Sequence, residues 1–272
     1  MPAVKQQGFT LIELIVVIVI TGIIAVTSTQ FIVNTAKGFS ATSMRDKRAN
    51  TLRISLAKIE HQLHNSIKNS VRVRKSKHSQ CIEMLPISAS AFYLPNKSSR
   101  PSRQIKTISL NTNVIGKSPV LGSVAGSLAN TIKQPPNKQS LYYSVLNNSV
   151  LAQRKILQSP VTELELAKPI AIQTPAKQGL VHFTSSAVSY CLEKDSLYRY
   201  TNYAMKEKQP DSASLPNKEP QRVLLNQNLL PASFFSIDKK AKLLKINLVS
   251  EVNLAEATEE VMLHQQWWLS DE

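Results

Sequence analysis

Residues 8–26 read GFTLIELIVVIVITGIIAV, and this stretch decides most of what the chain can be. Apart from Glu13 and two threonines the run is apolar. The 18 residues from Phe9 to Val26 would form roughly 27 Å of helix at about 1.5 Å per residue. The apolar residues 31–33 can extend it. This length predicts a helix that crosses a membrane.

Glu13 is the residue of this run that needs an explanation. An ionised acid at the centre of a membrane helix costs about 2.5–3.5 kcal/mol on insertion scales, so such acids usually have a function. A secretory signal peptide cleaved near residues 25–27 would have a shorter apolar core, without an internal acid. A plain signal anchor accounts for the length of the run but leaves Glu13 unexplained.

A third interpretation rests on residues 8–13, GFTLIE, which resemble the processing site of type IV prepilins and type II secretion pseudopilins. In that family a prepilin peptidase cuts after the glycine, on the cytoplasmic side, and methylates the new amino terminus. The resemblance implies cleavage between Gly8 and Phe9, N-methylation of Phe9, and a role for Phe9 and Glu13 in subunit assembly. Glycine lets a protease approach the backbone closely. The charge of Glu13 is tolerable if it pairs with the terminal ammonium of the next subunit.

The pattern after the apolar run predicts that the helix continues. No proline occurs between Pro2 and Pro86. Gly22 and Gly38 each cost about 1 kcal/mol against alanine in a helix, which indicates either local bending or simple tolerance. We expect the helix to end near residues 69–70. One apolar stripe with a period of 3.6 residues faces the core, and it consists of Leu52, Leu56, Ile59, Leu63 and Ile67.

Alternating apolar segments beyond residue 70 predict antiparallel strands. The segment 193–196 is a polar link between two of them, which predicts a hairpin. Residues 96–139 are rich in Ser, Asn, Pro and Lys and predict a long loop with a few short strands, and residues 209–220 predict another loop. The predicted strands are 71–74, 81–85, 180–183, 188–192, 197–200, 233–237, 243–249 and 261–268.

These elements predict an α+β fold of the type IV pilin kind, in which a long N-terminal hydrophobic helix packs on an antiparallel β-sheet. The expected organisation has four parts. Residues 1–8 form a leader peptide, and residues 9–33 form the transmembrane and filament-core half of the helix. Residues 34–70 form its amphipathic half, and residues 71–272 form one β-rich periplasmic domain.

The chain has two cysteines, Cys81 and Cys191. A translocated domain meets an oxidising compartment, which favours a disulfide between them. Closing a loop of 110 residues would stabilise the fold by roughly 4–5 kcal/mol in the chain-entropy model. Two independent buried thiols are the alternative. Two cysteines without clustered histidines offer too few ligands for a zinc site.

The net charge of +15 is the second notable feature. Between Lys37 and Lys77 the chain has eleven lysines and arginines against Asp46 and Glu60. Such a surface attracts polyanions, including DNA and lipopolysaccharide. Binding of single strands would need interleaved aromatic residues, and only Phe39 lies in this stretch. A solvated helix face, or one that complements acidic neighbouring subunits, is the favoured interpretation.

No catalytic arrangement stands out in the sequence, which predicts a non-enzymatic protein without a metal or cofactor. There is no G-x-S-x-G motif and no glycine loop for a phosphate. The pair Trp267-Trp268 predicts one ring inward and one outward on a final strand. The histidines are scattered, at His61, His64, His78, His182 and His264.

Two further resemblances narrow the family. Residues 63–73 and 81–87 are similar to a large minor pilin of the mannose-sensitive haemagglutinin (MSHA) pilus system. The hairpin at residues 190–200 is similar to that protein and also to the J-type minor pseudopilin of type II secretion. These resemblances imply a minor pilin that primes, caps or decorates a pilus, or alternatively a J-type pseudopilin or a tip-located adhesin or DNA-binding pilin.

The resemblance also implies partners and a location. The partners are a prepilin peptidase, the major pilin, other minor pilins and the inner membrane. Lys5 and Lys37 flank the apolar run and give a slight charge bias that places the N-terminus in the cytoplasm. The subunit would then move from the inner membrane, with its globular domain in the periplasm, to the filament and its tip.

Overall fold

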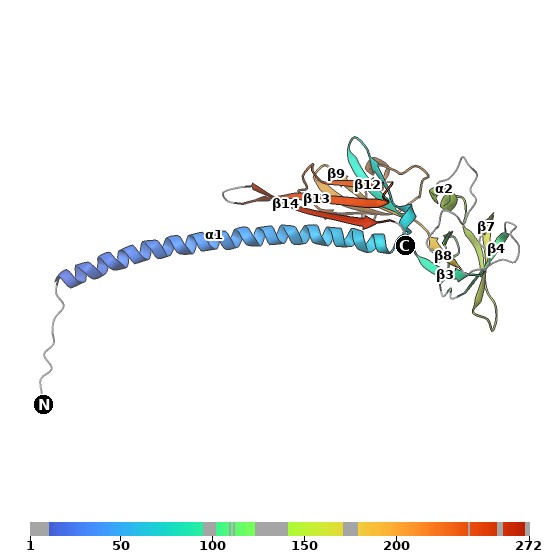
Figure 1. Cartoon of the computed structure of the whole chain (residues 1–272), viewed down its shortest axis with the longest axis horizontal. Helices are drawn as coiled ribbons and strands as arrows, with labels where there is room; N and C mark the ends of the chain where they lie inside the picture. Colours follow the sequence, from blue (N-terminus) through green and yellow to red (C-terminus); the bar gives the residue numbers. More distant parts are fainter. Residues whose placement is uncertain are drawn as a thin grey trace, which may run out of the picture.

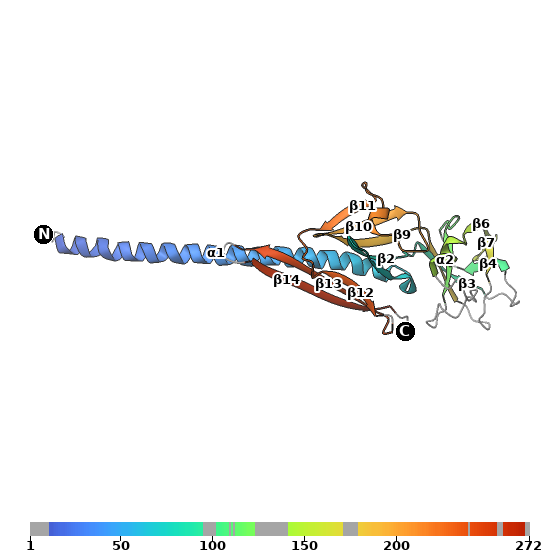
Figure 2. The same ribbon diagram turned by 90° about the horizontal axis from the view of Figure 1, so that it is seen from above.

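The computed structural model describes residues 11–94, 102–108, 110, 112–122, 141–170, 179–238, 240–254 and 258–269. One long helix carries a β-rich body on its C-terminal half, and its N-terminal half extends away from that body (Figures 1 and 2). The predicted α+β class is therefore confirmed. Gly8 and Phe9, the two residues of the predicted cleavage site, lie outside the described residues.

The long helix α1 spans Leu11–His64 and runs through both of its glycines without a break. Its end at His64 lies before the predicted end near residues 69–70. The chain turns away there because residues 65–67 pair with residues 85–87 instead. Ile67 N donates to Leu85 O at 2.9 Å, and Ile87 N donates to Asn65 O at 2.8 Å. A single 3₁₀ turn, η1 (Lys68–Ser70), then leads into the first strand.

Two antiparallel sheets pack against the second half of α1 and share one hydrophobic core with it. Leu52 and Ile59 of the helix are fully buried in this core. The first sheet has the order β1 (Arg72–Lys75), β2 (Ser79–Met84), β9 (Ala187–Glu193), β10 (Ser196–Tyr203) and β11 (Arg222–Asn226). The second sheet has the order β12 (Phe234–Asp238), β13 (Leu243–Asn253) and β14 (Thr258–Trp268).

A third sheet forms a lobe at the end of the molecule away from the free half of α1 (Figure 1). It has its own hydrophobic cluster. The short helix α2 (Leu141–Leu146) lies between this sheet and the first one, where Val145 and Val120 join a cluster that contains both cysteines. The sheet order is β5 (Ser118–Gly122), β8 (Gly179–Thr184), β3 (Ala89–Tyr93), β4 (Ser102–Ile108), β7 (Val161–Ile170) and β6 (Val150–Lys155).

The predicted hairpin is the connection between β9 and β10. Glu193 and Ser196 are themselves paired, so the turn consists of Lys194 and Asp195 alone. Lys194 has a left-handed φ of 52°, as tight hairpin turns require. Each of the eight predicted strands overlaps an observed strand. The predicted loop at 96–139 contains β4 and β5 among its described residues, and the loop at 209–220 contains one 3₁₀ turn, η3 (Ser212–Ser214).

Candidate assembly site

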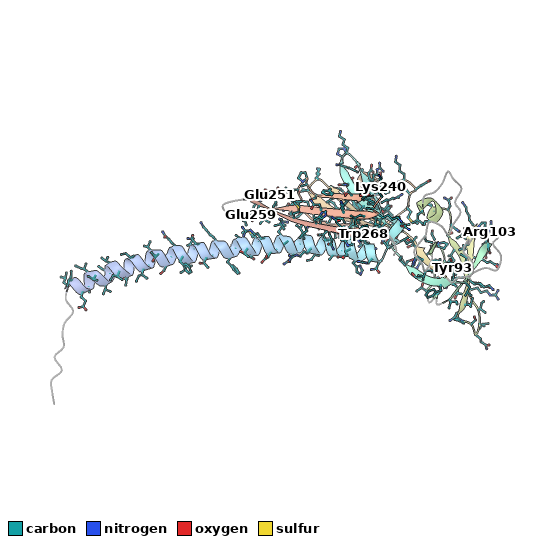
Figure 3. The ribbon with its side chains drawn as sticks, in the orientation of Figure 1. Tyr93, Arg103, Lys240, Glu251, Glu259 and Trp268 are labelled. Carbon is teal, nitrogen blue, oxygen red and sulfur yellow. A yellow bond between two sulfur atoms is a disulfide. The ribbon has the colours of Figure 1, made fainter. Side chains whose placement is uncertain are left out.

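The N-terminal half of α1 presents an extended apolar surface. Every residue from 11 to 40 is exposed, and its side chains project on all sides of the helix (Figure 3). By length and composition this helix could cross a membrane. Monomeric soluble proteins rarely expose so large an apolar surface. The structure therefore presents this half of α1 as a segment that requires an apolar environment.

The threonines of this half suit an apolar environment, because each satisfies its own hydroxyl. The side-chain Oγ1 donates back to a carbonyl one turn earlier in the helix, so no hydroxyl needs water. These bonds were not predicted from the sequence, although threonine within an apolar helix is their signal. The bonds are Thr21 to Val17 at 2.7 Å, Thr27 to Ile23 at 3.1 Å, Thr29 to Ala25 at 2.8 Å and Thr35 to Phe31 at 2.8 Å.

Glu13 lies in the first turn of α1. The amino end of a helix carries a partial positive charge, which favours a carboxylate in the first turn. Because the cleavage site lies outside the described residues, the roles of Gly8, Phe9 and Glu13 stay predictions.

The second half of α1 holds the globular part. Four members of the predicted stripe, Leu52, Leu56, Ile59 and Leu63, are buried in the shared core. The fifth, Ile67, is also buried, but it lies beyond the helix and packs beside the two cysteines. The placement of Ile67 on the helix was therefore wrong, since the chain leaves the helix at residue 64 to pair with residues 85–87.

The last strand, β14, is tied to α1 near both of its ends. Arg45 and Glu259 form a paired contact at 2.6 Å, and these hydrogen bonds hold the pKa of the Glu259 carboxyl below its usual value. At the other end Trp267 Nε1 donates to Glu60 Oε1 at 3.3 Å. Trp267 also packs against the shared core while Trp268 is 67% exposed, so the prediction of one ring inward and one outward is confirmed.

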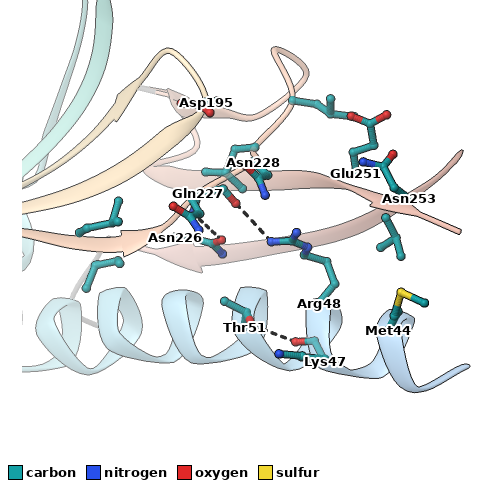
Figure 4. Close-up of a pocket in the computed structure, with 15 residues that line it drawn as sticks. Met44, Lys47, Arg48, Thr51, Asp195, Asn226, Gln227, Asn228, Glu251 and Asn253 are labelled. Atoms are coloured by element: carbon teal, nitrogen blue, oxygen red, sulfur yellow. Dashed lines mark hydrogen bonds between the residues drawn. The ribbon is translucent and has the colours of Figure 1, made fainter. Parts of the chain in front are cut away.

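A groove of about 890 Å³ lies between α1, β11 and β13 (Figure 4). Arg48 reaches into it from the helix and donates to Gln227 O at 3.4 Å, while Glu251 lines its other side. Its lining has no serine, histidine or cysteine, and the hydroxyl of Thr51 donates to Lys47 O at 2.8 Å. The groove is a gap where the helix meets the two sheets.

Cys81 and Cys191 lie directly opposite each other on β2 and β9. Their sulfur atoms are 2.08 Å apart and their Cα atoms 4.1 Å apart, and both residues are buried. The bond lies in the cluster that Val120 of the third sheet and Val145 of α2 join.

Glu83 places a buried carboxyl on strand β2, which also carries Cys81. Glu83 accepts from Arg72 Nε at 2.9 Å and from Tyr203 Oη at 3.1 Å, and Tyr203 Oη also lies 2.7 Å from Ser189 Oγ. Burial raises the pKa of Glu83, and the bonds from Arg72 and Tyr203 oppose this effect. Arg72 also donates to the backbone oxygens of Lys206 and Glu207, so the network ties the loop after β10 to the first sheet.

The predicted basic surface is smaller than the sequence count indicates, because part of its charge is used within the fold. Among the described cations between residues 37 and 77, Arg45 pairs with Glu259, Arg72 with Glu83, and Arg74 with Asp211. Other cations of this stretch are exposed, among them Lys47, Arg53 and Lys58.

Histidine chemistry does not form a metal site in the described part of the chain, where no group of three or more His, Cys, Asp or Glu residues could hold an ion. His182 lies 2.7 Å from Ser90 through its Nδ1. His64 lies 3.8 Å from Glu60 on the helix surface.

Comparison with known families identifies the N-terminus. Residues 4–29 match the family model described as the prokaryotic N-terminal methylation motif. The motif supports a type IV pilin-like or pseudopilin subunit. It covers the predicted cleavage site, Glu13 and the apolar half of α1 as far as residue 29. The motif implies processing by a prepilin peptidase and assembly with other pilins. No match was found among curated proteins or among solved structures.

Proposed function

We propose that the chain is a minor pilin, a non-enzymatic subunit that primes, caps or decorates a type IV pilus of the MSHA type. The observation that carries this proposal is the methylation motif at residues 4–29, which continues directly into a helix that is exposed from residue 11 to residue 40. A helix of this kind has two apolar environments in a pilin's life, the inner membrane before assembly and the filament core after it.

On this proposal each part of the chain has a role in assembly. The leader of residues 1–8 is removed in the cytoplasm, and Phe9 becomes the methylated first residue. Glu13 then pairs with the ammonium of a neighbouring subunit, which compensates its charge inside the filament. The disulfide-bonded globular part stays in the periplasm until the subunit enters the pilus near its tip. The resemblance at residues 63–73 and 81–87 supports the MSHA subtype.

A J-type minor pseudopilin is the second candidate, supported by the hairpin resemblance at residues 190–200, which is the hairpin β9–β10. The genes beside this one separate the two candidates. A major pilin and an assembly ATPase without secretion components would support the pilus, and secretion components would support the pseudopilin. Deletion of the gene separates priming from binding. If the subunit primes assembly, its deletion should remove all filaments. A tip adhesin or DNA-binding subunit requires normal filaments that have lost adhesion or DNA uptake.

The direct test is the mature N-terminus and the fate of a Glu13→Leu variant. Mass spectrometry of the full chain from cells should find N-methylated Phe9 as the first residue. The Glu13→Leu chain should insert and be cleaved normally, yet be depleted from sheared filaments, whereas Val17→Leu one turn later should be incorporated normally. A mature chain that begins after Ala25, or normal incorporation of Glu13→Leu, would contradict the proposal.

A further inference from the structure

The last strand, β14, has an open edge. All eleven of its residues, Thr258–Trp268, pair with β13 in one continuous register without a bulge. On its other side no strand lies among the described residues. Natural proteins usually protect such an edge with lysine, proline or a bulge, and β14 has none of these. Its backbone therefore offers a row of donors and acceptors to a further strand.

The face of β14 that points away from α1 carries exposed apolar side chains beside this edge. Met262 is 58% exposed and Trp268 is 67% exposed, with His264 and Gln266 exposed on the same face. The only carboxylates of the strand, Glu259 and Glu260, lie within its first three residues. The remaining eight residues thus combine apolar surface with an unprotected edge.

A like-charge pair stands at the start of β14. Glu260 lies directly opposite Glu251 of β13, an arrangement that destabilises a sheet. Figure 3 shows Glu251 at this end of the hairpin, above α1, and Trp268 at the opposite end. Lys47 and Arg48 line the same groove as Glu251. Even so, no ion pair joins Glu251 or Glu260 to a cation of the described chain.

The sequence around this pair is acidic in an otherwise basic protein. Residues 246–272 have six acids and no lysine or arginine, whereas residues 1–245 have 33 lysines and arginines against 12 acids. In the described chain none of these cations lies opposite Glu251 in the sheet, where Glu260 is its partner. A cation that completes the pair would have to come from outside the described chain.

We infer that the outer edge of β14 receives an extended segment of a neighbouring pilin-type subunit, with a lysine or arginine of that segment against Glu251 and Glu260. Strand addition of this kind takes its affinity from main-chain hydrogen bonds and its specificity from side chains. The direction of β14 fits such a neighbour, because the strand runs alongside α1 from the contact of Glu259 with Arg45 to the contact of Trp267 with Glu60. The inference rests on the proposed function, since it requires a neighbour whose helix lies in the same membrane or filament.

Site-specific photocrosslinking in cells tests this inference with the full chain. Benzoylphenylalanine replaces Met262 in one strain and Leu157, which is 93% exposed in the distal lobe, in a control strain. We expect an adduct from position 262 to a second subunit that carries the same N-terminal motif, identified by mass spectrometry. The adduct should fall several-fold in Glu251→Lys/Glu260→Lys. It should persist in Glu165→Lys/Glu207→Lys, which changes the net charge equally at other exposed glutamates.

The outcomes separate this inference from the proposed function. Sheared filaments that contain the chain without an adduct at position 262 would overturn the inference and leave the function intact. An adduct only to lipid or to proteins without the motif, or one unaffected by the Glu251→Lys/Glu260→Lys change, would also overturn it. Absence of the chain from filaments and from any pilin-type complex would overturn the function and the inference together.

Discussion

Arg45 of the N-terminal helix and Glu259 of the last strand form a two-point contact across 214 positions of sequence. Nε of the arginine lies 2.6 Å from Oε2 of the glutamate, and Nη2 lies 2.6 Å from Oε1. Fifteen residues of helix to Glu60 span about 22 Å, and eight residues of strand to Trp267 span about 26 Å. The helix span and the strand span are similar in length, so β14 follows α1 from one contact to the other.

We predict that this contact fixes the free end of the β13–β14 hairpin on the helix. Arg45→Gln or Glu259→Gln should raise the amide exchange rates of residues 258–262 and leave those of β9 unchanged. The exchanged pair Arg45→Glu/Glu259→Arg should restore protection. Hydrogen exchange of the full chain in detergent measures this, and equal protection in all four chains would contradict it.

The same contact predicts a pH dependence. The bonds from Arg45 lower the folded-state pKa of Glu259 below its ordinary value of 4.5. A carboxyl with a lowered folded pKa stabilises the folded state above its ordinary pKa, and this contribution is lost as pH falls through the folded value. Protection of residues 258–262 should therefore be constant from neutral pH to about 4.5 and decline at lower pH. Glu259→Gln should lack this decline.

The buried carboxyl of Glu83 predicts the opposite dependence. Burial raises its folded-state pKa above 4.5, so the folded chain holds this proton more tightly than the unfolded chain. The contribution of Glu83 to the free energy of unfolding is then greatest below pH 4.5 and declines as pH rises through the folded pKa. Glu83→Gln should remove that decline, which denaturant unfolding of the full chain at a series of pH values measures.

Arg72 supplies the control for Glu83. Removing one partner of a buried pair costs about 3–5 kcal/mol, because the other charge stays buried. Arg72→Met should therefore destabilise the chain strongly at neutral pH and less at pH 4, where Glu83 takes up a proton. Arg72→Met/Glu83→Gln should recover part of the loss, with the bonds from Arg72 to Lys206 and Glu207 still missing. An equal loss at both pH values would contradict the coupling.

The regular patterns of the sequence predicted the helix, eight strands and the inward ring of Trp267, because periodicity reports which face of an element is buried. The signal for β7 was also present, since Thr162, Leu164 and Leu166 alternate as its buried face. The pairing of Arg45 with Glu259 had no such signal. It depends on how the last hairpin lies on the helix, and no local pattern encodes a contact across so many residues.

The end of α1 shows the same limit at a single boundary. Ile67 continues the helical spacing, and nothing in residues 65–70 breaks a helix as proline would. The structure ends the helix at His64, where Ile67 N and Asn65 O bond to Leu85 and Ile87 instead of continuing the helical ladder. Those partners are some twenty residues away, so propensity and periodicity could not locate the boundary.

The two cysteines give the last prediction. Cys81 and Cys191 are direct cross-strand partners in β2 and β9, and both are buried beside Ile67 and Val145. In the chain-entropy model the bond stabilises the fold by roughly 4–5 kcal/mol, because it shortens the unfolded chain across a loop of about 110 residues. Cys81→Ser/Cys191→Ser should therefore unfold at a lower denaturant concentration than the parent, with a free energy of unfolding that is lower by roughly 4–5 kcal/mol.

Reductant provides the matched control. It should lower the unfolding midpoint of the parent full chain to near that of Cys81→Ser/Cys191→Ser and leave the variant itself unchanged. A thiol reagent added to the unfolded, unreduced parent should label no cysteine, since the chain has two and both are in the bond. Labelling of both would establish two independent buried thiols, and the link between β2 and β9 would then depend on backbone pairing and packing alone.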